Sequence, residues 1–114
     1  MAACEHMLRQ TASDALTKAR GCHVINISSV AGLLSVPGIA LYSSSKHAVR
    51  SYTRALAVEL KGTGVHATVL CPAPVTTPML NEMEGKRDAD IIFAAESLFS
   101  PEDIATAITD DIMV

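Results

Sequence analysis

The sequence is poor in aromatic residues, cysteines and charges, and each shortage argues against a class of protein. Of its 114 residues, 4% are aromatic and none is tryptophan, so an aromatic-lined pocket is not expected. The three cysteines are odd in number and form no Cys-x-x-Cys pair, which indicates free thiols in a reducing, cytoplasmic environment. The net charge of −3 disfavours a nucleic-acid partner, because such proteins usually present a basic face.

Metal-binding and membrane-spanning patterns are also missing. The four histidines have no His-x-x-x-His or Cys/His spacing of the kind that metals favour, so we expect no metal site. The start of the chain lacks the basic and apolar segments of a signal peptide. Residues 21–45 contain no Asp, Glu, Lys or Arg, but their polar side chains would be costly in a bilayer. We interpret this stretch as buried structure and expect no membrane partner.

The spacing of apolar residues predicts helices that alternate with other structure. Apolar side chains recur at helical spacing over 4–19 and again over 41–61. The segment 62–67 matches Gly-x-Gly-x-x-Ala, but it lies between a helix and a strand, the reverse of a nucleotide-binding turn, so its glycines are interpreted as a helix stop. Ser100, followed by proline and two acids, is typical of a helix N-cap.

Two short segments rich in β-branched residues, 22–28 and 65–71, predict buried strands. Strands that alternate with helices indicate an α/β fold with a parallel sheet, in which ligands bind beyond the carboxyl ends of the strands. That rule points to Ser28 and Ser29 after the first strand and to 72–77 after the second. The length and the 49% hydrophobic content predict one domain, residues 1–114, with one core.

Tyr42 and Lys46 are four residues apart at the start of a predicted helix, so both project from one face. A free tyrosine is a poor proton donor or acceptor at neutral pH, and a nearby ammonium favours its phenolate form. The pair is therefore suited to acid–base catalysis, although a surface contact with no catalytic role would have the same spacing. Ser29 ends the preceding strand, where its hydroxyl can point into the same cleft.

Three motifs together resemble a known family. They are Asn-Ile-Ser-Ser-x-x-Gly at 26–32, Tyr-x-x-x-Lys at 42–46 and Pro-Ala-Pro-Val-Thr-Thr-Pro-Met at 72–79. In this order and at these intervals, they resemble the carboxyl-terminal half of a short-chain dehydrogenase/reductase, over about residues 4–108. The resemblance implies a partial Rossmann-like fold, a doubly wound parallel sheet that is truncated because the amino-terminal half of the family's domain is missing.

The resemblance also implies catalytic roles for three residues. Ser29 would orient and polarise the carbonyl or hydroxyl of the substrate. Tyr42 would be the general acid in reduction and the general base in oxidation. Lys46 would favour the phenolate of Tyr42 and bind the nicotinamide-ribose hydroxyls. The implied reaction is hydride transfer between NAD or NADP and a secondary alcohol or ketone, in which the cofactor supplies the hydride chemistry.

The implied cofactor site includes the end of the first strand and the loop after the second. Besides Tyr42 and Lys46, the residues implied to contact the nicotinamide are Ile27, Pro72, Ala73, Pro74, Val75 and Thr77. The family usually has glycine at the position of Ala73, and we expect the extra methyl group to be tolerated but to weaken binding. The choice between NAD and NADP depends on residues of the missing half.

Two functions therefore stay open. The chain is an NAD(P)-dependent oxidoreductase, or it is a truncated, non-catalytic remnant or interface fragment of one; alone, it is expected to be inactive. In the family, helices that match 4–20 and 42–61 pack against their counterparts in a second subunit. We therefore expect a homo-oligomer that acts on a small alcohol or ketone.

Overall fold

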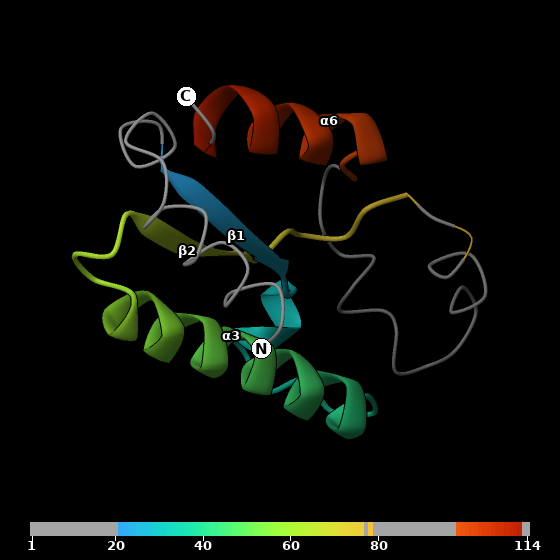
Figure 1. Ribbon diagram of the computed structural model, residues 1–114. Coiled ribbons are helices and arrows are strands. Elements are labelled where there is room, and N and C mark those ends of the chain that lie inside the picture. Colours follow the sequence, from blue (N-terminus) through green and yellow to red (C-terminus); the bar gives the residue numbers. More distant parts are fainter. Residues whose placement is uncertain (1–20, 77, 79–97, 113–114) are drawn as a thin grey trace.

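The computed structural model describes residues 21–76, 78 and 98–112 (Figure 1). The helix expected at 4–19 lies outside these described residues. The same is true of Thr77 and of residues 79–97. The elements in chain order are β1 (Cys22–Ile27), η1 (Val30–Gly32), α3 (Ala40–Glu59), β2 (Val65–Leu70), α6 (Pro101–Thr106) and η3 (Ala107–Ile112).

The two strands pair in parallel, as the alternation of strands and helices predicted. Cys22 is the partner of Val65, and the register continues without a break to Ile27 and Leu70. Both strands are one residue shorter than the predicted segments. Because the pairing is parallel, the chain crosses from the end of β1 to the start of β2, and α3 forms most of that connection.

The long helix α3 lies against one face of the strands (Figure 1). Its contact with β1 includes a hydrogen bond in which Asn26 Nδ2 donates to Thr53 Oγ1 at 2.9 Å. The helix ends at Glu59, and Gly62 and Gly64 follow with φ of 83° and 81°, values that favour glycine. The interpretation of these glycines as a helix stop is therefore confirmed.

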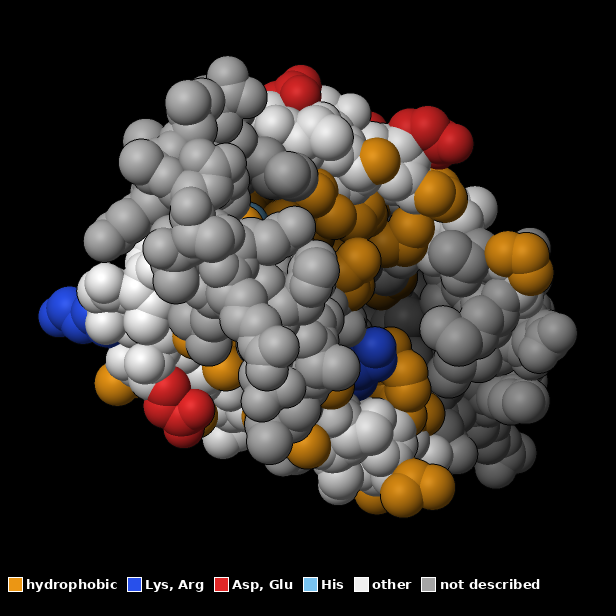
Figure 2. All heavy atoms as spheres, viewed as in Figure 1, with side chains coloured by type: hydrophobic (Ala, Val, Ile, Leu, Met, Phe, Trp, Pro, Cys, Tyr) orange, Lys and Arg blue, Asp and Glu red, His pale blue; other side chains and the backbone are white. Residues whose placement is uncertain are grey.

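Few large side chains are fully buried among the described residues. The buried apolar residues are Ala31, Leu60 and Val65, and three polar residues, Ser28, Ser43 and Thr53, are buried with them. Large apolar side chains remain exposed on α3 and in the segment before α6. Figure 2 shows hydrophobic side chains gathered around a hollow between α6 and α3. The described elements therefore form thin layers with apolar surface left uncovered.

The short helix α6 begins with a capping box at Ser100. The Ser100 hydroxyl accepts from the Asp103 N–H at 3.1 Å, and the Asp103 carboxylate accepts from the Ser100 N–H at 2.7 Å. The same carboxylate also accepts from the Ser100 hydroxyl at 2.8 Å. The bonds that it accepts from the Ser100 backbone and hydroxyl lower the pKa of Asp103 below its ordinary value of 3.8. The predicted N-cap is thus confirmed.

Within the described ranges, no helix has the length and apolar content that a bilayer crossing requires.

Candidate functional site

The carboxyl end of β1 positions two consecutive serines. Ser28 extends the parallel ladder, because its N–H donates to the Leu70 carbonyl at 2.7 Å. Ser29 then leaves the sheet and caps η1, where its Oγ accepts from the Ala31 N–H at 3.2 Å. A serine hydroxyl has one hydrogen and two acceptor positions, so Ser29 can still donate to another group. Its side chain is half-buried.

The first two turns of α3 place Lys46 beside Tyr42. The Lys46 Nζ lies 5.6 Å from the centre of the Tyr42 ring, and both side chains are half-buried. The same ammonium donates to the Ile27 carbonyl at 3.3 Å. The structure therefore brings together the end of β1, Lys46 and Tyr42.

The loop after β2 is joined to this site through its backbone. The Val30 N–H, within η1, donates to the Pro72 carbonyl at 2.9 Å. Further along, Thr76 N–H donates to the Phe99 carbonyl at 2.8 Å, and Phe99 N–H donates to the Pro74 carbonyl at 3.1 Å. These bonds fix the loop between η1 and the segment before α6. The loop residues from Pro72 to Val75 are half-buried.

Two buried serines, to which the sequence analysis gave no role of their own, connect these parts. Ser28 Oγ donates to the Lys46 carbonyl at 2.8 Å. Ser43 Oγ donates to the Ala31 carbonyl at 2.6 Å and lies 3.0 Å from the Leu34 carbonyl. Both serines are buried. Ser28 was indicated only by its place after the first strand, and no motif predicted the partner of either hydroxyl. The partners are backbone carbonyls distant in the sequence, so periodicity contained no signal for these contacts.

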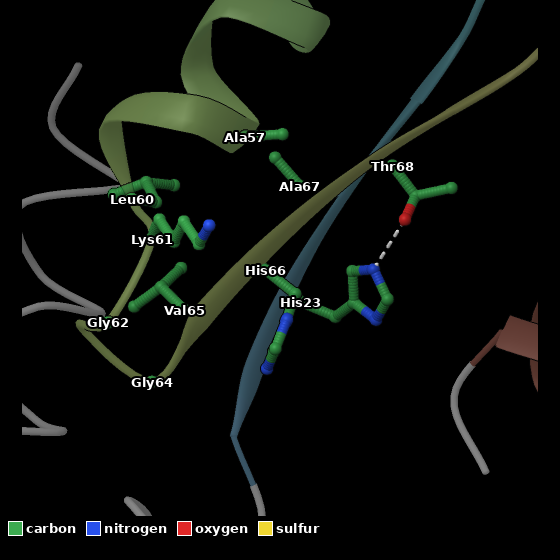
Figure 3. A pocket seen from close by; sticks show the side chains of 10 residues that line it. All are labelled: His23, Ala57, Leu60, Lys61, Gly62, Gly64, Val65, His66, Ala67 and Thr68. Atoms are coloured by element: carbon green, nitrogen blue, oxygen red, sulfur yellow. Dashed lines mark hydrogen bonds between the residues drawn. The ribbon is translucent and has the colours of Figure 1, made fainter.

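A separate hollow of about 250 Å³ lies at the opposite end of the strands (Figure 3). It is bordered by the turn after α3 and by the beginnings of both strands. His23 and His66 are register partners there, with ring centres 5.8 Å apart, and His23 Nε2 lies 2.7 Å from Thr68 Oγ1. Among the residues that the structure describes, no three potential metal ligands gather in one place. None of the residues proposed for catalysis or nicotinamide contact lines this hollow.

Comparisons with known proteins agree on one family. The short chain dehydrogenase family profile matches residues 4–88. The chain is 37% identical over 90 residues to 1-deoxy-11-beta-hydroxypentalenate dehydrogenase of Streptomyces exfoliatus, covering 79% of this chain and 31% of that protein. It is also 37% identical over 103 residues to the inactive 2-(S)-hydroxypropyl-CoM dehydrogenase 2 of Xanthobacter autotrophicus, covering 83% and 44%.

A solved structure with a similar fold is that of ElxO with NADP bound. It superposes with a TM-score of 0.71 at 29% identity, over 93% of this chain and 41% of that one. The chain therefore spans less than half the length of these relatives. Together with the parallel pairing across α3, the likeness confirms the expected partial α/β fold. On the extent of the profile match and the identity to these relatives, the chain belongs to the short chain dehydrogenase family.

Proposed function

We propose that this chain supplies the proton-transfer residues of an NAD(P)-dependent oxidoreductase that interconverts a secondary alcohol and a ketone. The observation that supports the proposal best is the position of the Lys46 ammonium, bonded to the Ile27 carbonyl and 5.6 Å from the centre of the Tyr42 ring. Family membership and the bound NADP of ElxO add to this support.

Ser29 is proposed to orient the substrate oxygen. Its Oγ already accepts a hydrogen bond from the Ala31 N–H, so the direction of the side chain is fixed and its hydrogen is free to donate. A hydrogen bond from Ser29 would polarise a substrate carbonyl. The same contact would hold an alcohol oxygen for proton transfer in the reverse reaction.

Tyr42 is proposed to exchange the proton with that oxygen. In reduction, the Tyr42 hydroxyl gives its proton to the oxygen of the new alcohol, and in oxidation the phenolate takes the proton from the alcohol. Lys46 is proposed to supply a positive charge beside this proton transfer, since its Nζ lies 5.6 Å from the centre of the Tyr42 ring. Ile27, Lys46 and Val75 would hold the nicotinamide beside these groups, and the cofactor would supply the hydride chemistry at the carbon of the substrate.

The residues at the carboxyl ends of the strands fit the nicotinamide end of a dinucleotide. Lys46 has three N–H donors and uses one on the Ile27 carbonyl, which leaves two for ribose hydroxyls. The proposed contacts of the nicotinamide are Ile27, Tyr42, Lys46, Pro72, Ala73, Pro74, Val75 and Thr77, the last of which lies outside the described residues. The Ala73 methyl group is expected to weaken this contact.

We propose that the chain alone does not turn over substrate. It covers 31% and 44% of the two dehydrogenase relatives, and among the described residues no Gly-x-Gly-x-x-Gly turn leads from a strand into a helix to hold a pyrophosphate. A non-catalytic role is the second candidate, which the inactive Xanthobacter relative favours. The free thiols of Cys22 and Cys71 support a reducing, cytoplasmic location.

Titration with reduced nicotinamide mononucleotide tests the proposed site on the chain itself. This ligand lacks the adenosine half of the cofactor, so its binding needs the nicotinamide contacts alone. We expect weak, saturable NMR shift changes at Ile27, Lys46 and Val75, and none at His66 in the separate hollow. Shift changes that are absent, or equal at both ends of the strands, would contradict the proposal.

Matched variants make this titration specific. Lys46→Met keeps most of the unbranched side chain and removes its N–H donors, so it is expected to abolish the shift changes at Ile27. Arg54→Met removes an exposed cation from the same helix and is expected to leave the titration unchanged.

If catalysis with NADH or NADPH is detected, Tyr42→Phe should abolish it, whereas Tyr52→Phe should not. Substantial turnover by the unmodified chain would refute the proposal that the chain is inactive by itself.

The exposed face of α3 is proposed to bind a second copy of the chain. Leu41, Ala48, Tyr52 and Ala55 recur at helical spacing and are all exposed, with 87% of Leu41 and 53% of Tyr52 accessible. Small and large apolar residues in one stripe suit packing between helices. The helix expected at 4–20 belongs to the same proposal, and it lies outside the described residues.

A further inference from the structure

We infer that the two buried serines, Ser28 and Ser43, are positioning residues that fix the distance between Ser29 and the Tyr42–Lys46 pair. The inference rests on the proposed function for the roles of those three residues. The contacts themselves are independent of it. Neither serine is proposed to touch substrate or cofactor.

Ser28 binds the backbone of Lys46, and the preceding residue, Ile27, binds the Lys46 side chain. The Ser28 hydroxyl donates to the Lys46 carbonyl at 2.8 Å, and the Lys46 ammonium donates to the Ile27 carbonyl at 3.3 Å. Ser28 is 3% exposed, and its N–H is part of the ladder to Leu70. Consecutive residues at the end of β1 thus fix Lys46 at two points, so its ammonium has a defined position relative to the sheet.

Ser43 connects the start of α3 to Ser29 through one buried residue. The Ser43 hydroxyl donates to the Ala31 carbonyl at 2.6 Å, and the Ala31 N–H donates to Ser29 Oγ at 3.2 Å. Ser43 is 5% exposed and directly follows Tyr42 in the helix. A continuous path of two hydrogen bonds therefore runs from Ser29 to the residue beside Tyr42.

Gly32 shows how closely η1 and α3 approach each other at these contacts. A β-carbon at Gly32 would lie 2.5 Å from Ser28 Oγ and 2.8 Å from the Lys46 carbonyl oxygen. Neither atom can move freely, because the two are hydrogen-bonded to each other. The η1 turn, which contains Ala31, therefore packs against the backbone of Lys46, and position 32 has no room for a methyl group.

Such contacts matter for proton transfer because that step tolerates little displacement. A shift of about 1 Å in the reacting groups can lower the rate by about a hundredfold. Without the hydroxyls of Ser28 and Ser43, η1 and α3 would keep their apolar contacts but lose the directional bonds that set their separation. The serines would then determine geometry as well as stability.

NMR of the chain tests this without any need for turnover. The closeness of the Lys46 ammonium to the Tyr42 ring predicts a ring-current shift of the Lys46 ε-protons. We expect Ser28→Ala to remove most of that shift in the folded state. The exposed Ser51 of α3 gives the control, because Ser51→Ala should leave the shift in place. A Ser28→Ala chain with a lower urea midpoint and an unchanged ring-current shift would show a merely structural role.

A second pair of variants isolates the hydroxyl of Ser43 at nearly constant volume. Ser43→Thr keeps the donor and is expected to retain the Lys46 shift and the Tyr42 ring resonances, whereas Ser43→Val is expected to change both. Equal spectra for the folded Thr and Val variants would overturn the inference. The nicotinamide titration tests the proposed function separately, since its failure would leave these spectral differences unaffected.

Discussion

Thr53 is the most buried side chain in the described part of the structure, and it is polar. Only 1% of its surface is exposed. Its hydroxyl donates to the Val49 carbonyl at 2.7 Å and accepts from Asn26 Nδ2 at 2.9 Å. The hydroxyl is therefore satisfied both as a donor and as an acceptor. The burial of this residue therefore depends on one helix carbonyl and on one side chain from the neighbouring strand.

Replacing Thr53 by valine preserves its shape and removes these two hydrogen bonds. The Asn26 amide would lose its partner against α3, and such an unsatisfied group costs about 1–3 kcal/mol. We expect Thr53→Val to lower the free energy of unfolding by that amount in urea titrations. Ser51→Ala on the exposed side of α3 should change it little. A Thr53→Val chain as stable as the original would show that the Asn26–Thr53 bond contributes nothing.

At the residue scale, sequence and structure agree where a motif spans a few positions. The closeness of Tyr42 and Lys46 could be predicted, because residues four positions apart in a helix lie on the same face. Ser43, one position from Tyr42, is buried because its hydroxyl meets the Ala31 carbonyl. That contact depends on how η1 packs against α3, which spacing along the chain does not encode.

At the scale of elements, caps and stops were predictable because they are local. The Ser100 N-cap and the glycine stop after α3 each depend on residues within one turn. The short η1 helix was not predicted, because residues 28–38 contained only loop signals. Its position depends on tertiary bonds such as the one from Val30 N–H to the Pro72 carbonyl.

The capping box of α6 makes the helix start sensitive to acid. The pKa of Asp103 is lowered by its bonds from the Ser100 backbone and hydroxyl, so the ionised carboxylate stabilises the folded cap. That contribution is fully present above the ordinary pKa of 3.8 and is lost as the pH falls through the lower, folded value. We expect the Ser100 amide proton to shift in one step with a midpoint below 3.8 in NMR titrations.

Asp103→Asn supplies the control for this titration. The amide side chain does not titrate, so the step at the Ser100 amide should disappear. If the step persisted in the variant, another acidic group would have to be responsible. A Ser100 amide shift that stays constant into strong acid would contradict the carboxylate bond.

At the scale of the whole molecule, the described residues leave large apolar side chains exposed, as the proposed self-association requires. Ile27, Leu41 and Val58 are each large and at least 48% exposed. Exposed apolar surface on this scale usually marks an interaction site. The stripe on α3 described above is the face proposed for that purpose.

Leu41→Glu tests whether the stripe mediates self-association. A carboxylate in a helix–helix contact would be desolvated without a partner, so we expect the variant to shift the chain toward monomer in sedimentation velocity. Thr106→Glu adds the same charge on the exposed side of α6 and should not change the distribution. A chain that is monomeric at all concentrations before mutation would remove the basis for the proposed dimer.

The parallel pairing of β1 and β2 has a consequence for the order in which the chain folds. Each residue of β1 has a partner on the far side of the whole α3 connection, so no strand hydrogen bond can form locally. The entropy of closing that long loop must be offset before the sheet contributes any stability. Helix α3 can begin to form from its own residues, and its docking brings the strands together. We therefore expect folding to be slow for a chain of this length, with the strand amides among the last to gain protection from exchange.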